Sequence, residues 1–178
     1  MKKNKRDFKS DLIFVTVLIA ILVIRVFVFT LARVDGSSME PNYSNGDFLI
    51  VNKTYKALKG VKRGDILMVK HKRNYLIKRV IGLPGDSIKA ENNVIYINGI
   101  SLEERYVKTK EKSFDFDEIT LDKDEYFVMG DNRFNSVDSR FFGPVNKKML
   151  KGVIIKKLIK SKHHIEVSPF DKYKNYIS

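Results

Sequence analysis

Hydrophobic positions follow two different patterns along the chain. The stretch LIFVTVLIAILVIRVFVFTLA, residues 12–32, is apolar on every face of a helix and carries one charge, Arg25. A helix over this range measures about 31 Å at about 1.5 Å per residue, close to the hydrocarbon thickness of a bilayer. A cleaved signal peptide has a shorter apolar region that ends in a small-x-small site, which this stretch lacks. The pattern therefore predicts a retained transmembrane helix over 12–32.

Beyond residue 32 the apolar positions form short runs, some alternating with polar residues and some continuous. Gly, Asn, Asp and Pro separate these runs, a pattern typical of β-strands joined by turns. The dipeptide Asn98-Gly99 lies between two of the runs and indicates a hairpin. Sustained helical periodicity is missing after residue 35, so we expect a mainly antiparallel β domain over 33–160. The predicted strands cover residues 48–53, 65–70, 75–82, 94–99, 126–130 and 152–159.

Two segments do not fit the strand pattern. Residues 103–124, EERYVKTKEKSFDFDEITLDKD, are polar and charged and predict a surface excursion inside a variable hairpin region at 87–124. Residues 161–178 are rich in lysine and tyrosine and predict a basic C-terminal tail outside the β domain.

The formal net charge of +13 is concentrated at the two ends of the chain. Basic residues outnumber acidic ones in 1–11 and in 146–178, whereas 33–145 is nearly balanced. Charge at the ends suits anionic membrane lipid better than nucleic acid, so no nucleic-acid partner is expected. The positive-inside rule makes 1–11 a basic cytoplasmic tail and places the β domain outside. We therefore expect a single-pass protein of the plasma membrane.

Several kinds of chemistry are excluded by residues that the chain does not contain. It has no cysteine, which excludes disulfides, thiolate zinc sites and a cysteine nucleophile. The GxSxG, HExxH and Walker motifs are missing as well. The three histidines, at 71, 163 and 164, have no spacing that indicates a triad or a metal site. We expect neither a cofactor nor a metal.

One candidate nucleophile lies directly after the apolar stretch, in GSSMEP at residues 36–41. Taken alone, this motif is equally typical of a turn or a helix N-cap. A serine here would act as a nucleophile only with a base from elsewhere in the chain, because no histidine lies near it in the sequence.

A candidate base occurs in YLIKRVIGLPGD, residues 75–86. Strand alternation puts Lys78 on the same face as Leu76 and Val80, toward the expected core. A solvated edge lysine is the alternative. A lysine held among apolar groups has a lowered pKa, and a fall of roughly 2–3 units from about 10.4 would make it a useful base near neutrality.

A third polar segment, GDNRFNSVDSR, covers residues 130–140. Its acidic and basic side chains can pair with one another, and its serine and asparagine side chains can hydrogen-bond to neighbours. A polar loop with internal ion pairs would have the same composition, so this segment alone assigns no function.

In this order, after one apolar N-terminal stretch, the three segments resemble the bacterial type I signal peptidases, of the Gram-positive type with a single span. The resemblance runs from about residue 24 to about residue 152. It implies an antiparallel β catalytic domain with a Ser-Lys dyad. On the matching positions, Ser38 is the implied nucleophile, Lys78 the general base, and Ser136 the residue that orients the lysine.

The resemblance also implies supporting and substrate-binding roles. Asp138 and Arg140 match a structural pair behind the site. Some relatives carry a serine two residues before the nucleophile that assists the oxyanion hole, and this chain has Gly36 there. The implied substrate-binding positions, at edges that hold a peptide in extended form, are Val34, Met39, Leu76 and Ile77.

The implied function is that of a membrane-bound serine endopeptidase. Such an enzyme removes signal peptides from exported preproteins, after small residues of the A-x-A type, at the outer face of the plasma membrane and in proximity to the secretion translocon. Two alternatives remain at this point. One is a non-catalytic or precursor-dedicated homologue that binds pilin-like or other preproteins, and the other is a membrane-tethered protein that binds anionic polymers through its basic ends.

Overall fold

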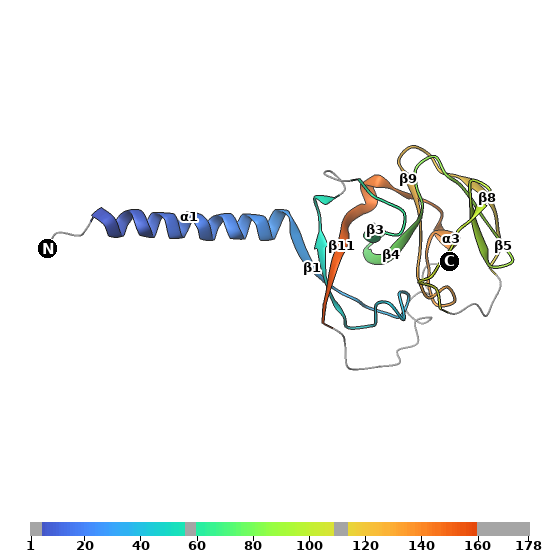
Figure 1. Ribbon diagram of the computed structural model, residues 1–178, viewed down its shortest axis with the longest axis horizontal. Coiled ribbons are helices and arrows are strands. Elements are labelled where there is room, and N and C mark those ends of the chain that lie inside the picture. Colours follow the sequence, from blue (N-terminus) through green and yellow to red (C-terminus); the bar gives the residue numbers. More distant parts are fainter. Residues whose placement is uncertain (1–4, 56–59, 109–113, 160–178) are drawn as a thin grey trace.

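The computed structural model describes residues 5–55, 60–108 and 114–159. A long helix, α1 (Lys5–Phe27), projects from a domain built of two antiparallel sheets (Figure 1). The larger sheet has the order β1-β2-β11-β3-β4-β9-β10 and the smaller one the order β7-β6-β5-β8. The larger sheet comprises β1 (Phe29–Arg33), β2 (Phe48–Asn52), β3 (Ile66–His71), β4 (Asn74–Gly82), β9 (Glu125–Met129), β10 (Val145–Asn146) and β11 (Leu150–Ile159). The remaining elements are β5 (Ser87–Glu91), β6 (Val94–Ile97), β7 (Ile100–Ser101), β8 (Phe116–Thr120), the short helix α3 (Ser139–Phe142) and the 3₁₀ turn η1 (Lys147–Met149).

The expected antiparallel β domain is confirmed. Each of the six predicted strands coincides with an element of the structure, namely β2, β3, β4, β6, β9 and β11. The predicted hairpin joins β6 to β7, and its two turn residues, Asn98 and Gly99, have φ angles of 52° and 79°. Positive φ at both central positions is the conformation that an Asn-Gly pair accepts at little cost.

The predicted boundaries of the N-terminal helix are wrong. The helix ends at Phe27, and residues 29–33 form β1, which pairs with β2 from Phe29↔Asn52 to Arg33↔Phe48. The apolar run did not reveal this change, because β-branched and aromatic residues suit a buried strand as well as an apolar helix. In the part of the chain that the structure describes, no helix combines the length and the apolar character needed to cross a membrane.

In the described part of 103–124, most charged side chains are exposed, as expected for a surface excursion, but the segment also contributes a strand and apolar contacts to the smaller sheet. Strand β8 pairs with β5, Leu121 is buried, and the Phe116 ring stacks on Phe127 at 5.3 Å between centroids. The apolar side chains of this segment pack against the core of the smaller sheet, while its charged residues dominate the composition and conceal that pattern. Residues 109–113, like the predicted tail at 161–178, lie outside the described residues.

Apolar packing fixes the chain on both sides of the motifs singled out above. One core cluster joins Val34 and Met39 to Leu49 and Val51 of β2. A second cluster contains Phe127 and Met129 of β9, just before the segment 130–140. The two segments with the candidate chemistry therefore start from rigid strands.

Candidate active site

The loop after β1 holds Ser38 in a fixed backbone position. Met39 is 1% exposed and packs in the core beneath the loop. The Asn132 backbone N–H donates to the Ser38 carbonyl at 3.0 Å, and the Asn132 side chain donates to the Ser37 carbonyl at 3.2 Å. The Asn135 side chain donates to Ser37 Oγ at 2.7 Å. Segment 130–140 thus holds the serine loop by three hydrogen bonds.

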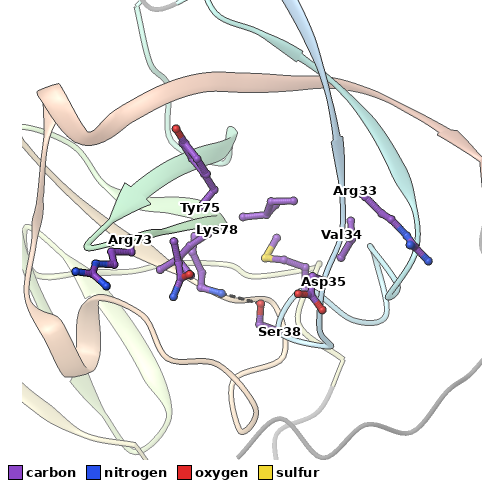
Figure 2. A pocket seen from close by; sticks show the side chains of 11 residues that line it. Arg33, Val34, Asp35, Ser38, Arg73, Tyr75 and Lys78 are labelled. Atoms are coloured by element: carbon purple, nitrogen blue, oxygen red, sulfur yellow. Dashed lines mark hydrogen bonds between the residues drawn. The ribbon is translucent and has the colours of Figure 1, made fainter. Parts of the chain in front are cut away.

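Lys78 reaches this serine from β4. Its side chain is 2% exposed, and it shares its face of the strand with the buried Val80, as the alternation predicts. Lys78 Nζ donates to Ser38 Oγ at 2.7 Å, a contact between residues far apart in the sequence (Figure 2). The structure therefore brings together the two side chains that the sequence singled out as nucleophile and base.

Burial tunes the acidity of this lysine. Desolvation lowers the pKa of Lys78 to about 8, against the opposing attraction of the nearby Asp138 carboxylate and with a smaller contribution from Arg140. With such a pKa roughly one lysine in ten is neutral at pH 7, so an amine that can accept a proton is available near neutrality. A pKa in this range is what a general base near neutrality requires.

Segment 130–140 is built around the buried carboxylate of Asp138. Its Oδ2 accepts hydrogen bonds from the Gly130 N–H at 2.9 Å and from Ser136 Oγ at 2.6 Å, and Arg140 binds both carboxylate oxygens at 2.8 Å. Burial alone would raise the pKa of Asp138, but the Arg140 ion pair and these hydrogen bonds outweigh burial and lower it. Asp138 and Arg140 thus form the predicted pair, and the Ser136 hydroxyl is directed to Asp138.

The backbone conformation at residue 36 favours glycine. Its φ angle is +101°, in the region that L-residues with a side chain rarely adopt, and its N–H donates to Asn45 Oδ1 at 3.1 Å. A Cβ at this position would meet no heavy atom within 4 Å, so space is available for a side chain. Backbone strain, rather than crowding, therefore disfavours a serine at this position.

The four predicted substrate-binding residues line one groove. Val34, Met39, Leu76 and Ile77 line a cavity of about 280 Å³ together with Ser38 and Lys78. Figure 2 shows Val34, Ser38 and Lys78 around this cavity. Within the described residues, no group of acidic or histidine side chains is arranged to hold a metal ion.

Two strand edges flank this groove. The segment from Tyr75 to Lys78 pairs with β3 on one side, and the ladder between β4 and β9 begins only at Arg79. On the other side of the groove, β1 stands at the end of the larger sheet and continues into Val34. An extended peptide lying between these edges would find backbone partners on both sides.

Sequence reasoning missed the residues that hold the loops together. Asn132 and Gly130 lie in segment 130–140, but nothing in the sequence indicates which residues of that segment contact the serine loop. An added Cβ at Gly130 would collide with Ser136 Oγ and with the Ser38 carbonyl. The close approach of these two segments therefore depends on a glycine.

Comparisons with known proteins point to one family. The family model described as signal peptidase, peptidase S26, matches residues 8–158. Signal peptidase I P of Bacillus subtilis subsp. natto is 40% identical over 168 residues, covering 85% of this chain and 90% of the relative. Signal peptidase I U of Bacillus subtilis (strain 168) is 39% identical over 150 residues, covering 78% and 80%. A crystal structure of a signal peptidase I from Enterococcus faecalis V583 aligns with a TM-score of 0.49 and 35% identity, covering 55% of this chain and 98% of that one.

Proposed function

Because the chain belongs to the signal peptidase family, peptidase S26, and is therefore a serine endopeptidase that acts on the signal peptides of preproteins, we propose that Ser38 is its nucleophile and Lys78 its general base. The observation that carries this proposal is the 2.7 Å contact between the buried Lys78 Nζ and Ser38 Oγ inside a groove. A buried lysine with a lowered pKa next to a hydroxyl is the arrangement that activates a serine without histidine.

The chemistry follows from this contact. Neutral Lys78 accepts the Ser38 proton as Oγ attacks the scissile carbonyl, and the Ser38 backbone N–H donates to the oxyanion that forms. Lys78 then passes the proton to the amine of the departing mature protein, which leaves an acyl-enzyme. A water deprotonated by Lys78 attacks the ester and releases the signal peptide, and the proton returns to Ser38 Oγ. The Ser136 hydroxyl donates to the Asp138 carboxylate, and we propose that it acts on Lys78 through the charge of that carboxylate, which raises the pKa of the lysine.

The groove accounts for the substrate that we propose. A signal peptide lies extended between β1 and the segment 75–78, as an added strand. Its side chains at −1 and −3 point into the groove toward Val34, Met39 and Ile77. These side chains and the peptide backbone together occupy a cavity of about 280 Å³. The limited space favours small residues of the A-x-A type at these positions.

Membrane attachment is the second part of the proposal. Apolar side chains are exposed along α1, among them Phe14, which is 69% exposed, and Ile13, which is 65% exposed. The apolar surface continues over Phe29 and Leu31 of β1 toward Ile155 of β11, around a second cavity of about 270 Å³. We propose that this continuous surface anchors the enzyme in the plasma membrane as a single-pass protein. Residues 1–11 then lie on the cytoplasmic side, next to anionic lipid, and the catalytic domain lies at the outer face, near the translocon.

The non-catalytic alternative from the sequence is disfavoured by the Ser38–Lys78 contact. Burying a lysine amine costs free energy, because burial disfavours its charged form. A protein that only bound preproteins would gain nothing to offset this cost.

Processing of a preprotein tests the function directly. The full chain in detergent is incubated with a preprotein that carries an A-x-A site, and mass spectrometry locates the new N-terminus. We expect cleavage after the second alanine, and a loss of cleavage of at least about tenfold when that −1 alanine is replaced by leucine, since the extra side chain overfills the groove. Cleavage that ignores the −1 residue would contradict the proposed binding mode.

The pH dependence of the reaction tests the lysine base. The neutral form of Lys78 reacts, and its pKa is about 8, so kcat/KM should rise with pH and level off above about 8. Below the pKa the rate should fall about tenfold per pH unit, because each unit leaves about a tenth as much neutral amine. A peptide substrate without titratable groups near the site serves as the control. A profile that stays flat from about pH 5 to 9 would rule out this lysine as the base.

A further inference from the structure

The segment Glu104–Tyr106, called here the 104–106 segment, contacts all three catalytic segments. These are the loop after Ser38, strand β4 with Lys78, and segment 130–140. The 104–106 segment lies between β7 and β8, in the part of the chain that was expected to be a surface excursion. Its contacts with the catalytic segments are made by one ring, one carboxylate and one backbone carbonyl.

The first contact is made to the residue that follows the base. Arg79 donates to both carboxylate oxygens of Asp131, at 2.7 and 2.6 Å, and its guanidinium lies 4.0 Å from the centroid of the Tyr106 ring. The Asp131 side chain is fully buried and that of Arg79 is 13% exposed. The two hydrogen bonds to Asp131 and the Tyr106 ring on its face leave the Arg79 guanidinium little freedom to move. Arg79 directly follows Lys78 in β4, so its fixed position restrains Lys78 as well.

The second contact reaches the nucleophile loop. The Asn42 side-chain amide donates to the Tyr106 carbonyl at 2.9 Å and to Asp131 Oδ2 at 2.8 Å. Asn42 follows Ser38 in the same loop, after Pro41. One amide group therefore joins the serine loop both to the 104–106 segment and to the ion pair beside Lys78.

The third contact reaches segment 130–140. Glu104 accepts hydrogen bonds from the Tyr106 hydroxyl at 2.7 Å and from Arg133 Nη1 at 2.8 Å. Arg133 is 4% exposed and its Nε donates to the Gly130 carbonyl at 3.0 Å. Burial, reinforced by the Glu104 charge, raises the pKa of Tyr106, so its hydroxyl stays protonated and remains a donor at any working pH.

A network of this kind acts as a unit. Buried ion pairs tolerate little rearrangement, because each charge that loses its partner remains desolvated. The network spans four segments that are distant in the sequence, and two of them carry the atoms that must meet at 2.7 Å. A displacement of about 1 Å between reacting groups can reduce a rate by about 10²-fold.

We propose that Tyr106 is a positioning residue for the dyad. Its ring holds Arg79 and its carbonyl holds Asn42, and in this way the 104–106 segment sets the distance between Lys78 Nζ and Ser38 Oγ. This inference rests on the Ser38–Lys78 chemistry proposed above.

Three variants of the full chain in detergent test it with a peptide substrate. Tyr106→Leu removes the ring and should lower kcat by on the order of 10²-fold, with KM changed less than about threefold, because the groove residues are untouched. Tyr106→Phe keeps the stacked ring and the carbonyl and should retain kcat within about fivefold. Tyr96→Leu is the matched control, because its ring lies 5.2 Å from Lys89 in the smaller sheet and should leave kcat near the native value.

The pH profile separates positioning from a purely structural role. If the 104–106 segment holds the dyad closed, Tyr106→Leu admits water to Lys78 and moves the midpoint of the profile upward, toward the ordinary lysine value of about 10.4. A loss of folded protein would lower the amplitude and leave the midpoint in place. If Tyr106→Leu does not fold, Asn42→Ala removes one of the same contacts and should shift the midpoint in the same direction.

A native kcat or an unmoved midpoint in Tyr106→Leu would overturn the inference, and so would an equal loss of kcat in Tyr96→Leu. If Tyr106→Leu does not fold, an unmoved midpoint in Asn42→Ala overturns it. Ser38→Ala, measured in parallel, keeps the two proposals apart. Cleavage by Ser38→Ala would rule out the dyad itself. An inactive Ser38→Ala together with a native kcat in Tyr106→Leu would rule out the positioning role alone.

Discussion

Replacing either Ser38 or Lys78 with alanine should reduce preprotein cleavage by on the order of 10⁴-fold or more. Ser38→Ala removes the proposed nucleophile, and Lys78→Ala removes the proposed base, whose Nζ lies 2.7 Å from Ser38 Oγ. Because the two side chains act in one step, the double variant should be no slower than either single variant. The measurement is the rate of release of the mature protein by the full chain under single-turnover conditions.

The chain offers matched controls for both substitutions. Ser37→Ala removes a neighbouring hydroxyl that accepts a hydrogen bond from Asn135 and should slow cleavage less than about tenfold, since one hydrogen bond contributes about 1 kcal/mol. Lys89→Ala removes a lysine on β5 that pairs with Glu91 and should leave the rate near native. Substantial activity in Lys78→Ala, or equal losses in Ser37→Ala and Ser38→Ala, would contradict the assigned dyad.

Gly130→Ala should lower the cleavage rate by on the order of 10²-fold, the second large effect that the structure predicts. The added methyl group collides with Ser136 Oγ and with the Ser38 carbonyl, so segment 130–140 and the nucleophile loop must move apart. That movement breaks the hydrogen bond from Asn132 to Ser38 and displaces Ser38 Oγ from Lys78. Rates are compared per folded molecule, with the folded fraction taken from thermal unfolding.

Gly152→Ala provides the control for this substitution. A Cβ at Gly152 would come within 2.6 Å of Val51 Cγ1 and 2.7 Å of the Asn52 carbonyl, a comparable collision between β11 and β2, with β3 between β11 and β4. It should lower the thermal midpoint and leave the rate per folded molecule close to native. If Gly130→Ala and Gly152→Ala lose the same activity per folded molecule, the effect of Gly130 is one of stability alone.

The sequence predicted the features that depend on local pattern. Alternation along β4 placed Lys78 on the buried face, and six strands followed from short apolar runs. It failed where the deciding contacts are distant. Pairing with β2 makes the end of an apolar run into strand β1. The pairing of Glu104 with Arg133 and the stacking of Tyr106 on Arg79 attach a charged segment to the rest of the domain. In each failure the missing information was the identity of the partner, which a single sequence does not contain.

The junction between α1 and β1 fixes the distance between the end of the helix and the groove. The helix ends at Phe27 and the strand begins at Phe29, while the Lys53 N–H donates to the Val28 carbonyl at 2.8 Å and the Lys53 ammonium donates to the Val26 carbonyl. Strand β1 then advances roughly 17 Å toward the groove, at about 3.3 Å per residue. If α1 is anchored in lipid, as proposed above, the height of Ser38 above the bilayer is constant. The enzyme would therefore select each precursor by the length of chain between its apolar core and its cleavage site, as well as by the residues at that site.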